Sequence, residues 1–160
     1  DHVQTRVDAW IDPFGHFETS GFQIAQASFS MADGGLTGTG LGRGQPDRVP
    51  IVESDFIFSA IGEELGLAGS TAILMAFLVL IGSGLRIALR ADHPFEKLLA
   101  VGLTTLLGLQ AFIIIGGVIR LVPLTGITLP FVSYGGSALV SNYVVLALLM
   151  RLSHEQRMAR

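Results

Sequence analysis

Four acidic residues stand beside a long uncharged stretch, and they are the residues of this sequence best suited to acid–base chemistry. Glu53, Asp55, Glu63 and Glu64 are followed by residues 65–85, which carry no charge. A run of that length can cross a bilayer as a helix. A carboxylate gains nothing from lipid, so one held at a membrane surface is a candidate for proton transfer. Hydration or structural pairing is the alternative for Glu63 and Glu64.

Asp55 is aligned with a row of small residues if a helix begins there and continues into the apolar run. The spacing places Ser59, Gly62, Gly66 and Gly69 on one narrow face. A face without bulky side chains leaves a groove, with the Asp55 carboxylate at its outer end. The alternative is that Asp55 only caps the helix and that the glycines allow close helix packing.

The composition indicates a membrane protein, because 50% of the 160 residues are hydrophobic and only 14% are charged. Three apolar runs are long enough to span a bilayer, at residues 65–85, 98–119 and 137–152. Prolines and paired glycines interrupt the uncharged sequence before the third run, so we expect a folded-in loop there. We therefore expect an all-α polytopic membrane protein, with residues 1–64 as a large loop and 65–160 as the membrane part.

The basic residues predict the orientation of these spans. Residues 1–64 and the loop 120–136 should face outward, and the loop 86–97 and the C-terminus should be cytoplasmic. The cytoplasmic set is Arg86, Arg90, Lys97, Arg151, Arg157 and Arg160, against Arg48 and Arg120 on the other side. The protein is therefore expected to span a membrane with its acidic cluster on the outer side. Because the sequence begins at Asp1 in polar residues without a Met, we expect it to be part of a longer protein.

The outer segment should contain a short helix lying at the membrane interface. Ser20 can cap this helix, which would continue to about Met31 and end at Gly34 and Gly35. Its apolar face would hold Phe22, Ala25 and Phe29. The outer segment as a whole is expected to be a large loop that contains short interfacial helices.

The glycine-rich sequence 34–44 invites comparison with a phosphate-binding loop, but it lacks both the P-loop and the dinucleotide-binding pattern. Its glycines are better explained as turn residues with positive φ. The four histidines are far apart with no zinc-ligand spacing, and there are no cysteines. The net charge of −3 and the scattered basic residues argue against a nucleic-acid partner.

Seven short motifs are spread along nearly the whole chain. They are RV (6–7), WIDP (10–13), GFQ (21–23), GLG (40–42), DFIF (55–58), GEELG (62–66) and LTGITLPFVSYGGSAL (124–139). In this order they resemble the C-terminal part of the SEDS family, the RodA, FtsW and SpoVE proteins. The stretch QAFIIIGGVIRLVPLTG favours the RodA branch over the FtsW branch.

The resemblance implies a cell-wall enzyme of the bacterial plasma membrane, with roughly ten membrane helices, each long enough to cross the bilayer. This family polymerises lipid II into peptidoglycan glycan strands, in elongation or division, and works with a class B penicillin-binding transpeptidase. Its essential aspartate matches Asp55. The present sequence would hold the large outer loop and the last three helices, and we expect it to be inactive by itself.

The implied chemistry needs one base and a positive environment. Asp55 would take the proton of the attacking sugar hydroxyl as the glycosidic bond forms. The leaving group is a lipid diphosphate, which needs positive charge from Arg or from a divalent cation such as Mg²⁺ or Mn²⁺. The outer cations are Arg6, Arg48 and Arg120, for which a solvated loop charge is the alternative.

The loop before the third span is expected to close the substrate cavity, with a purely structural re-entrant turn as the alternative. The first two spans could form the docking face for the single helix of the transpeptidase. The loop residues proposed to contact substrate are Ser133, Tyr134, Gly135, Gly136 and Ser137.

Some positions depart from the family pattern. Ile51 stands where relatives commonly have Glu, which puts a metal or substrate role for Glu53 in doubt. Phe22 replaces a Tyr, Ile114 replaces an Asn found in some relatives, and Ala138 follows Ser137 where relatives have a second Ser. Two other functions stay open, a lipid II flippase and a non-catalytic scaffold of the elongation or division machinery.

Overall fold

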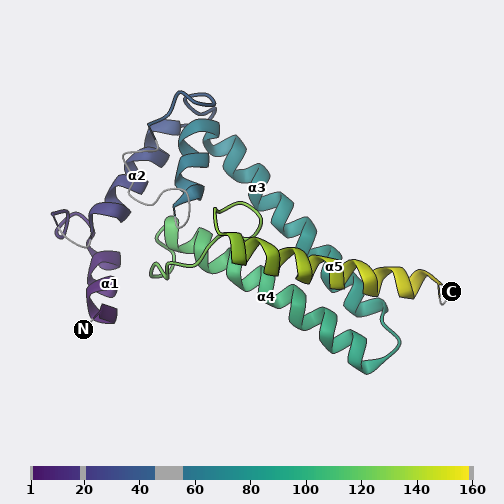
Figure 1. Ribbon diagram of the computed structural model, residues 1–160. Helices are drawn as coiled ribbons and strands as arrows, with labels where there is room; N and C mark the ends of the chain where they lie inside the picture. The colour runs from purple at the N-terminus through teal and green to yellow at the C-terminus, as the bar shows by residue number, and fades with distance from the viewer. Residues whose placement is uncertain (1, 19–20, 46–55, 159–160) are drawn as a thin grey trace.

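The computed structural model describes residues 2–18, 21–45 and 56–158, and its course is shown in Figure 1. Within these ranges the chain is helical and contains no strand, which confirms the all-α expectation. The helices are α1 (His2–Ile11), α2 (Phe22–Gly34), α3 (Ile57–Arg90), α4 (Pro94–Val118) and α5 (Gly136–Met158).

Helix α3 is broken at Gly66, which has φ 66° and ψ −164°. This backbone conformation is essentially restricted to glycine. Figure 1 shows that the short part before the break, 57–65, and the long part after it, 67–90, run in different directions. The expected continuous helix from Asp55 into the first span is therefore wrong, because the small residues of its supposed single face are divided between the two parts.

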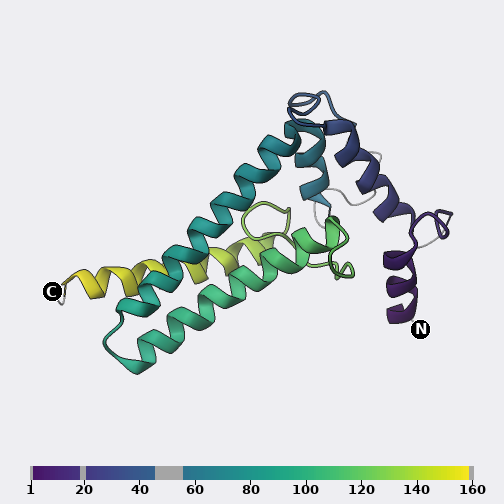
Figure 2. The same cartoon turned by 180° about the vertical axis from the view of Figure 1, so that it is seen from behind.

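The long part of α3 and helix α4 form an antiparallel pair joined by the short connection 91–93 (Figures 1 and 2). The connection ends at Pro94, which is favoured at the first position of a helix. A side chain at Gly84 would collide with the hydroxyl of Thr104. The two helices can approach closely there because α3 has no side chain at that point.

Helix α5, the last helix of the chain, packs on this pair. A second buried cluster joins the three helices through Ala88, Ala100, Leu107, Leu149 and Leu152. The side-chain Nε2 of Gln156 donates a hydrogen bond of 3.0 Å to the carbonyl of Ile87, which attaches the last turns of α5 to α3.

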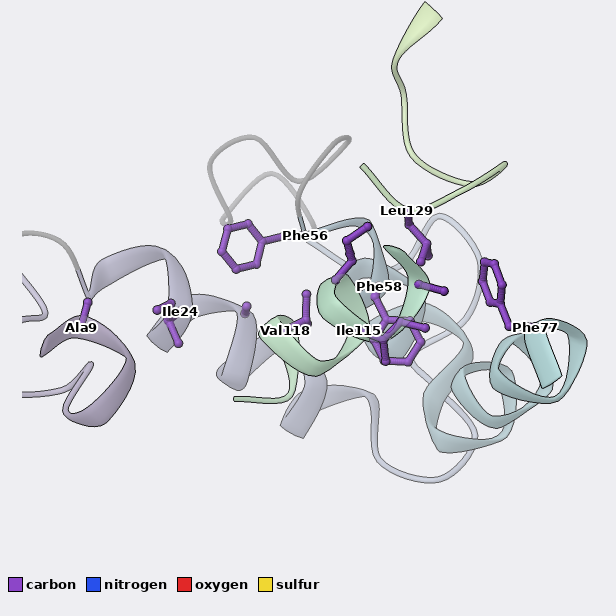
Figure 3. Close-up of a cluster of buried hydrophobic side chains, with 11 residues drawn as sticks. Ala9, Ile24, Phe56, Phe58, Phe77, Ile115, Val118 and Leu129 are labelled. Carbon is purple, nitrogen blue, oxygen red and sulfur yellow. The ribbon is translucent and has the colours of Figure 1, made fainter. Parts of the chain in front are cut away.

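Helix α2 rests on the short part of α3. Its buried face holds mainly small residues, and a side chain at Gly34 would collide with the carbonyl of Gly62. The main core lies where these elements meet α4 (Figure 3). The labelled members of this core are Ala9, Ile24, Phe56, Phe58, Phe77, Ile115, Val118 and Leu129.

Helices α3, α4 and α5 are each long and apolar enough to cross a membrane. They contain the expected spans, although α3 begins at Ile57 and α5 continues to Met158, so the expected division at residue 64 falls inside α3. Large apolar side chains such as Leu78, Leu89 and Leu98 are exposed along them, as lipid-facing residues are. The chain is a multi-pass membrane protein.

The structure adds two details to the first segment. Residues 2–11 form helix α1, and the three residues assigned to one apolar face of α2 differ in burial, since Ala25 is fully buried and Phe22 is partly buried. Phe29 is 47% exposed and contacts the ring of Phe14, whereas Ser30 is 5% exposed. Helix α2 turns its small residues toward α3 because they allow the closer backbone approach.

Candidate functional site

The candidate site lies at the end of the molecule where α1, the start of α3 and the loop 119–135 meet. Four residues with a role predicted or considered from the sequence lie outside the described residues. They are the proposed base Asp55, the cation Arg48, the carboxylate Glu53 and the predicted helix cap Ser20. The description therefore begins at Phe56, the neighbour of Asp55 in sequence. Its side chain is 1% exposed within the main core.

The short part of α3 is fixed tightly behind Phe56. Ser59 is fully buried, and its Oγ donates a hydrogen bond of 2.7 Å to the carbonyl of Phe56. Gly62 faces α2, where an added side chain would meet Met31 at 3.2 Å. Gly62 therefore allows α2 to pack closely on this part of α3, as the alternative for the glycines proposed.

The glycine-rich loop (34–44) supplies the backbone hydrogen bonds that α3 loses at Gly66. Four bonds join the loop to the break: Thr39 N to Glu63 O (2.9 Å), Gly40 N to Glu64 O (3.0 Å), Leu67 N to Gly35 O (2.9 Å) and Ala68 N to Leu36 O (3.2 Å). Carbonyls at a helix end and N–H groups at a helix start need such partners. Gly35, Gly38, Gly40 and Gly42 all have positive φ, as expected of turn glycines.

Glu63 and Glu64 face this loop. Glu63 is 5% exposed, and its Oε1 accepts a 2.6 Å hydrogen bond from the backbone N–H of Gln45. Its Oε2 is buried without a hydrogen-bond partner. Glu64 Oε1 accepts from the N–H of Gly42 at 3.1 Å. Glu64 thus holds the glycine-rich loop, and Glu63 holds the residue that follows it. This agrees with structural pairing and, for Glu63, excludes simple hydration.

Helix α1 is attached to the loop after α4 by a set of hydrogen bonds that we name the α1 clasp. Trp10 Nε1 donates to the carbonyl of Arg120 at 3.0 Å, and Arg120 Nη2 donates to the carbonyls of Trp10 and Ile11, both at 3.3 Å. Arg6 Nη1 donates to the carbonyl of Thr125 at 3.2 Å and to that of Leu124 at 3.5 Å.

The α1 clasp brings together two of the three predicted substrate cations. Arg6 and Arg120 hold backbone carbonyls, so each has an architectural role that the sequence did not indicate. Each guanidinium also has further N–H donors, since an Arg side chain carries five. Their contact with substrate stays a prediction. Sequence reasoning gave Trp10 no role, although it belongs to the WIDP motif that carried the family resemblance.

The loop 126–135 is irregular, as expected. Ser133 is 2% exposed, and its Oγ accepts the N–H of Leu129 at 2.8 Å. Gln110 of α4 donates from Nε2 to the carbonyl of Thr128 at 2.9 Å, which anchors the loop to α4. The next residue, Tyr134, is 77% exposed.

The five predicted loop contacts therefore divide into two groups. Ser133 is built into the loop itself, whereas Tyr134, Gly136 and Ser137 are exposed and Gly135 is partly buried. Helix α5 begins at Gly136, so the last two lie in its first turn. Substrate contact by these residues stays a prediction.

No group of three or more His, Cys, Asp or Glu residues that could hold a metal ion occurs in the described ranges. The α1 clasp places the guanidinium groups of Arg6 and Arg120 at the candidate site.

Comparison with known proteins gives a consistent result. The FtsW, RodA and SpoVE model of the cell cycle protein family matches residues 1–158. Peptidoglycan glycosyltransferase RodA of Mycobacterium tuberculosis (strain ATCC 25618 / H37Rv) is 55% identical over 98% of this chain and 34% of its own length. The probable peptidoglycan glycosyltransferase FtsW of Geobacter metallireducens is 42% identical over 96% of this chain and 41% of its own.

Two further relatives extend the likeness. Stage V sporulation protein E of Bacillus subtilis is 41% identical over 97% of this chain and 42% of its own length. A solved structure, described as structural coordination of polymerization and crosslinking by a peptidoglycan synthase complex, is similar with a TM-score of 0.76 and 25% identity. That match covers 97% of this chain and 41% of the other. The chain thus spans about a third to two fifths of the proteins it resembles.

Proposed function

Because this chain belongs to the FtsW, RodA and SpoVE family of cell cycle proteins, we propose that it is the C-terminal part of a peptidoglycan glycosyltransferase. The single observation that carries the proposal is 55% identity over 98% of the chain with proteins named peptidoglycan glycosyltransferase RodA. The substrate we propose is lipid II, and the product is a longer glycan strand. The activity belongs to the whole protein, of which this chain is about a third.

Asp55 is the residue we propose as general base. In the reaction, the attacking sugar hydroxyl loses its proton as its oxygen bonds to the anomeric carbon of the donor, and a positioned carboxylate can accept that proton. The bond that breaks joins this carbon to the diphosphate of the lipid. The diphosphate leaves as an anion, so no second carboxylic acid is required to protonate it.

Positive charge is the other requirement of the proposed reaction, since fixed charges near a leaving anion lower the barrier. Arg6 and Arg120 are candidates because the α1 clasp holds both guanidinium groups at the same junction, beside the loop 119–135. Arg48 stays a third candidate on sequence grounds alone. A need for Mg²⁺ or Mn²⁺ also stays a prediction, which removal of divalent ions with EDTA would test.

A class B penicillin-binding transpeptidase is the protein partner we propose. An apolar pocket of about 340 Å³ lies between α3 and α4, lined among others by Leu78, Gly108 and Phe112. A single apolar membrane helix could pack there. The similar solved structure is described as a peptidoglycan synthase complex that coordinates polymerization and crosslinking, which supports this partner. The basic residues listed above favour the Asp55 side as the outer face.

The test uses protein expressed from the complete gene, given fluorescent lipid II with and without the transpeptidase. We expect glycan polymer from the wild-type protein and its loss in Asp55→Asn. The matched control is Asp33→Asn, the same change at an exposed carboxylate of α2, which should polymerise normally. Polymer formed by Asp55→Asn at the wild-type rate would overturn the role of Asp55. Lipid II transported across vesicles without polymer in any condition would favour the flippase, and neither activity would favour a scaffold.

A further inference from the structure

Two adjoining pockets lie at the end of α3 and α5 that is remote from the candidate site. The first is a polar cleft of about 230 Å³, lined by Arg86, Arg90 and Arg157 together with Ser83 and Ser153. The second is an apolar pocket of about 380 Å³, lined mainly by Leu80, Leu146, Leu149 and Met150. Ser83, Ile87, Ser153 and Arg157 line both, so the two pockets are continuous.

The three arginines of the cleft carry uncompensated positive charge. Among the described residues, the one ion pair joins Arg151 and Glu155 on α5, and neither of these lines the pockets. No carboxylate lines the cleft. The three exposed arginines line the same cleft and repel one another, so a bound anion would reduce this repulsion.

The cleft is also held in shape by contacts within the protein. The Gln156 Nε2 that donates to the carbonyl of Ile87 closes one side, because it fixes α5 against α3. Buried Leu149 and Leu152 pack α5 onto the same region. The arginines at 86 and 90 are one turn apart on α3, and Arg157 approaches from α5. The positive site is therefore built from two helices that the core keeps together.

We propose that these pockets bind one anionic phospholipid, with its phosphate headgroup among the three arginines and an acyl chain in the apolar pocket. A basic pocket between membrane helices is a recognised kind of site for anionic lipid headgroups. A soluble anion would use only the cleft and leave the apolar pocket without an occupant. A lipid fills both, and it reaches them directly because α3 and α5 are membrane-spanning helices.

The leaflet follows from the distribution of charge. Lys97 and Arg151 lie near the same membrane surface as the three arginines of the cleft, and such an excess marks the cytoplasmic face. The lipid would therefore come from the inner leaflet. This inference does not depend on the proposed glycosyltransferase activity, since none of the residues involved belongs to the candidate site.

The experiment is native mass spectrometry of protein expressed from the complete gene, titrated with phosphatidylglycerol or cardiolipin and, separately, with phosphatidylcholine. We expect one tightly bound anionic lipid on the wild-type protein. The variant Arg86→Gln/Arg90→Gln/Arg157→Gln should bind it roughly a hundredfold more weakly, because each basic residue near an anionic headgroup contributes about fivefold. The matched control is Arg151→Gln, which removes one charge from α5 outside the pockets and should bind as the wild type does.

Further arms separate a lipid from other anions and from loss of structure. Glycerol 3-phosphate and inorganic phosphate carry the charge without acyl chains, and at millimolar concentration they should fail to displace the lipid. The thermal unfolding temperature of the triple variant should be at least that of Arg151→Gln in lipid-free detergent, because like charges have been removed. Equal lipid affinity in the triple variant and the wild type, equal loss in the Arg151→Gln control, or full displacement by inorganic phosphate would each overturn the proposal.

Discussion

Trp10 and Arg120 each bind the backbone of the other, although they lie 110 residues apart in sequence. The Trp10 indole donates to the Arg120 carbonyl at 3.0 Å, and the Arg120 guanidinium donates to the Trp10 carbonyl at 3.3 Å. Arg120 has φ 63°, which is rare and costly for a residue with a side chain. This contact therefore holds α1 against the strained end of α4. It also fixes the first residues of the loop 119–135.

The α1 clasp predicts a measurable coupling between these two side chains. Trp10→Phe should destabilise the protein by about 1 kcal/mol, the usual net value of one hydrogen bond. Arg120→Met should cost more, because the carbonyls of Trp10 and Ile11 lose their donor. Both hydrogen bonds join α1 to the same loop, so loss of one loosens the junction and weakens the other. The double variant should therefore be less destabilised than the sum by at least about 0.5 kcal/mol. Denaturation in detergent measures all four proteins, and additive effects would contradict this joint role of the two bonds.

Gly66 should tolerate no side chain. Gly66→Ala places a Cβ against the backbone of Gly38 and Leu36 in a conformation that costs about 1–3 kcal/mol for other residues. Thermal unfolding should show a clear loss of stability, and protease should cut the glycine-rich loop (34–44) sooner. The matched control is Gly82→Ala on the same helix, where an added Cβ meets nothing within 4 Å. Equal stability of the two variants would refute the break at Gly66.

Close packing of α3 on α4 depends on Gly84. Gly84→Ala should destabilise the pair by about 1–3 kcal/mol, because the new methyl group would overlap the Thr104 side chain. Adding Thr104→Ala should restore part of the loss, since the overlapping hydroxyl is removed. Gly102→Ala on α4 is the control, with open space around its Cβ. Failure of the second change to restore any stability would show that the helices do not meet at this point.

Alanine substitution of Ser133 should lower the stability of the protein, and alanine substitution of Ser137 should not, although both residues were predicted from sequence to contact substrate. Ser133→Ala leaves the buried N–H of Leu129 without its acceptor, which should cost about 1–3 kcal/mol of stability. Ser137 is exposed, so Ser137→Ala should leave the unfolding temperature unchanged. Unfolding curves of both variants, measured beside lipid II polymerisation, separate a structural loss from a loss of substrate contact. An unchanged unfolding temperature in Ser133→Ala would contradict this assignment.

The sequence by itself determined the membrane spans and the helical class, because span length and lack of charge are properties of continuous stretches. Residues 98–119 nearly coincide with α4, and residues 137–152 lie within α5. The interrupted loop before α5 was also predicted, since Pro and paired Gly disfavour helix whatever surrounds them. The family motifs named the candidate aspartate.

Only the tertiary structure decided what the small and charged residues of the outer segment contact. The sequence predicted only turns for the glycine-rich loop (34–44), whereas in the structure this loop also completes the hydrogen bonding of α3 at Gly66. Arg6 and Arg120 were candidate cations, and the fold makes them the attachment of α1. Local sequence could not show this, because each contact joins segments distant along the chain and is selected by how closely two backbones approach. Spans follow from the solubility of single stretches, whereas such contacts depend on which stretches the fold brings together.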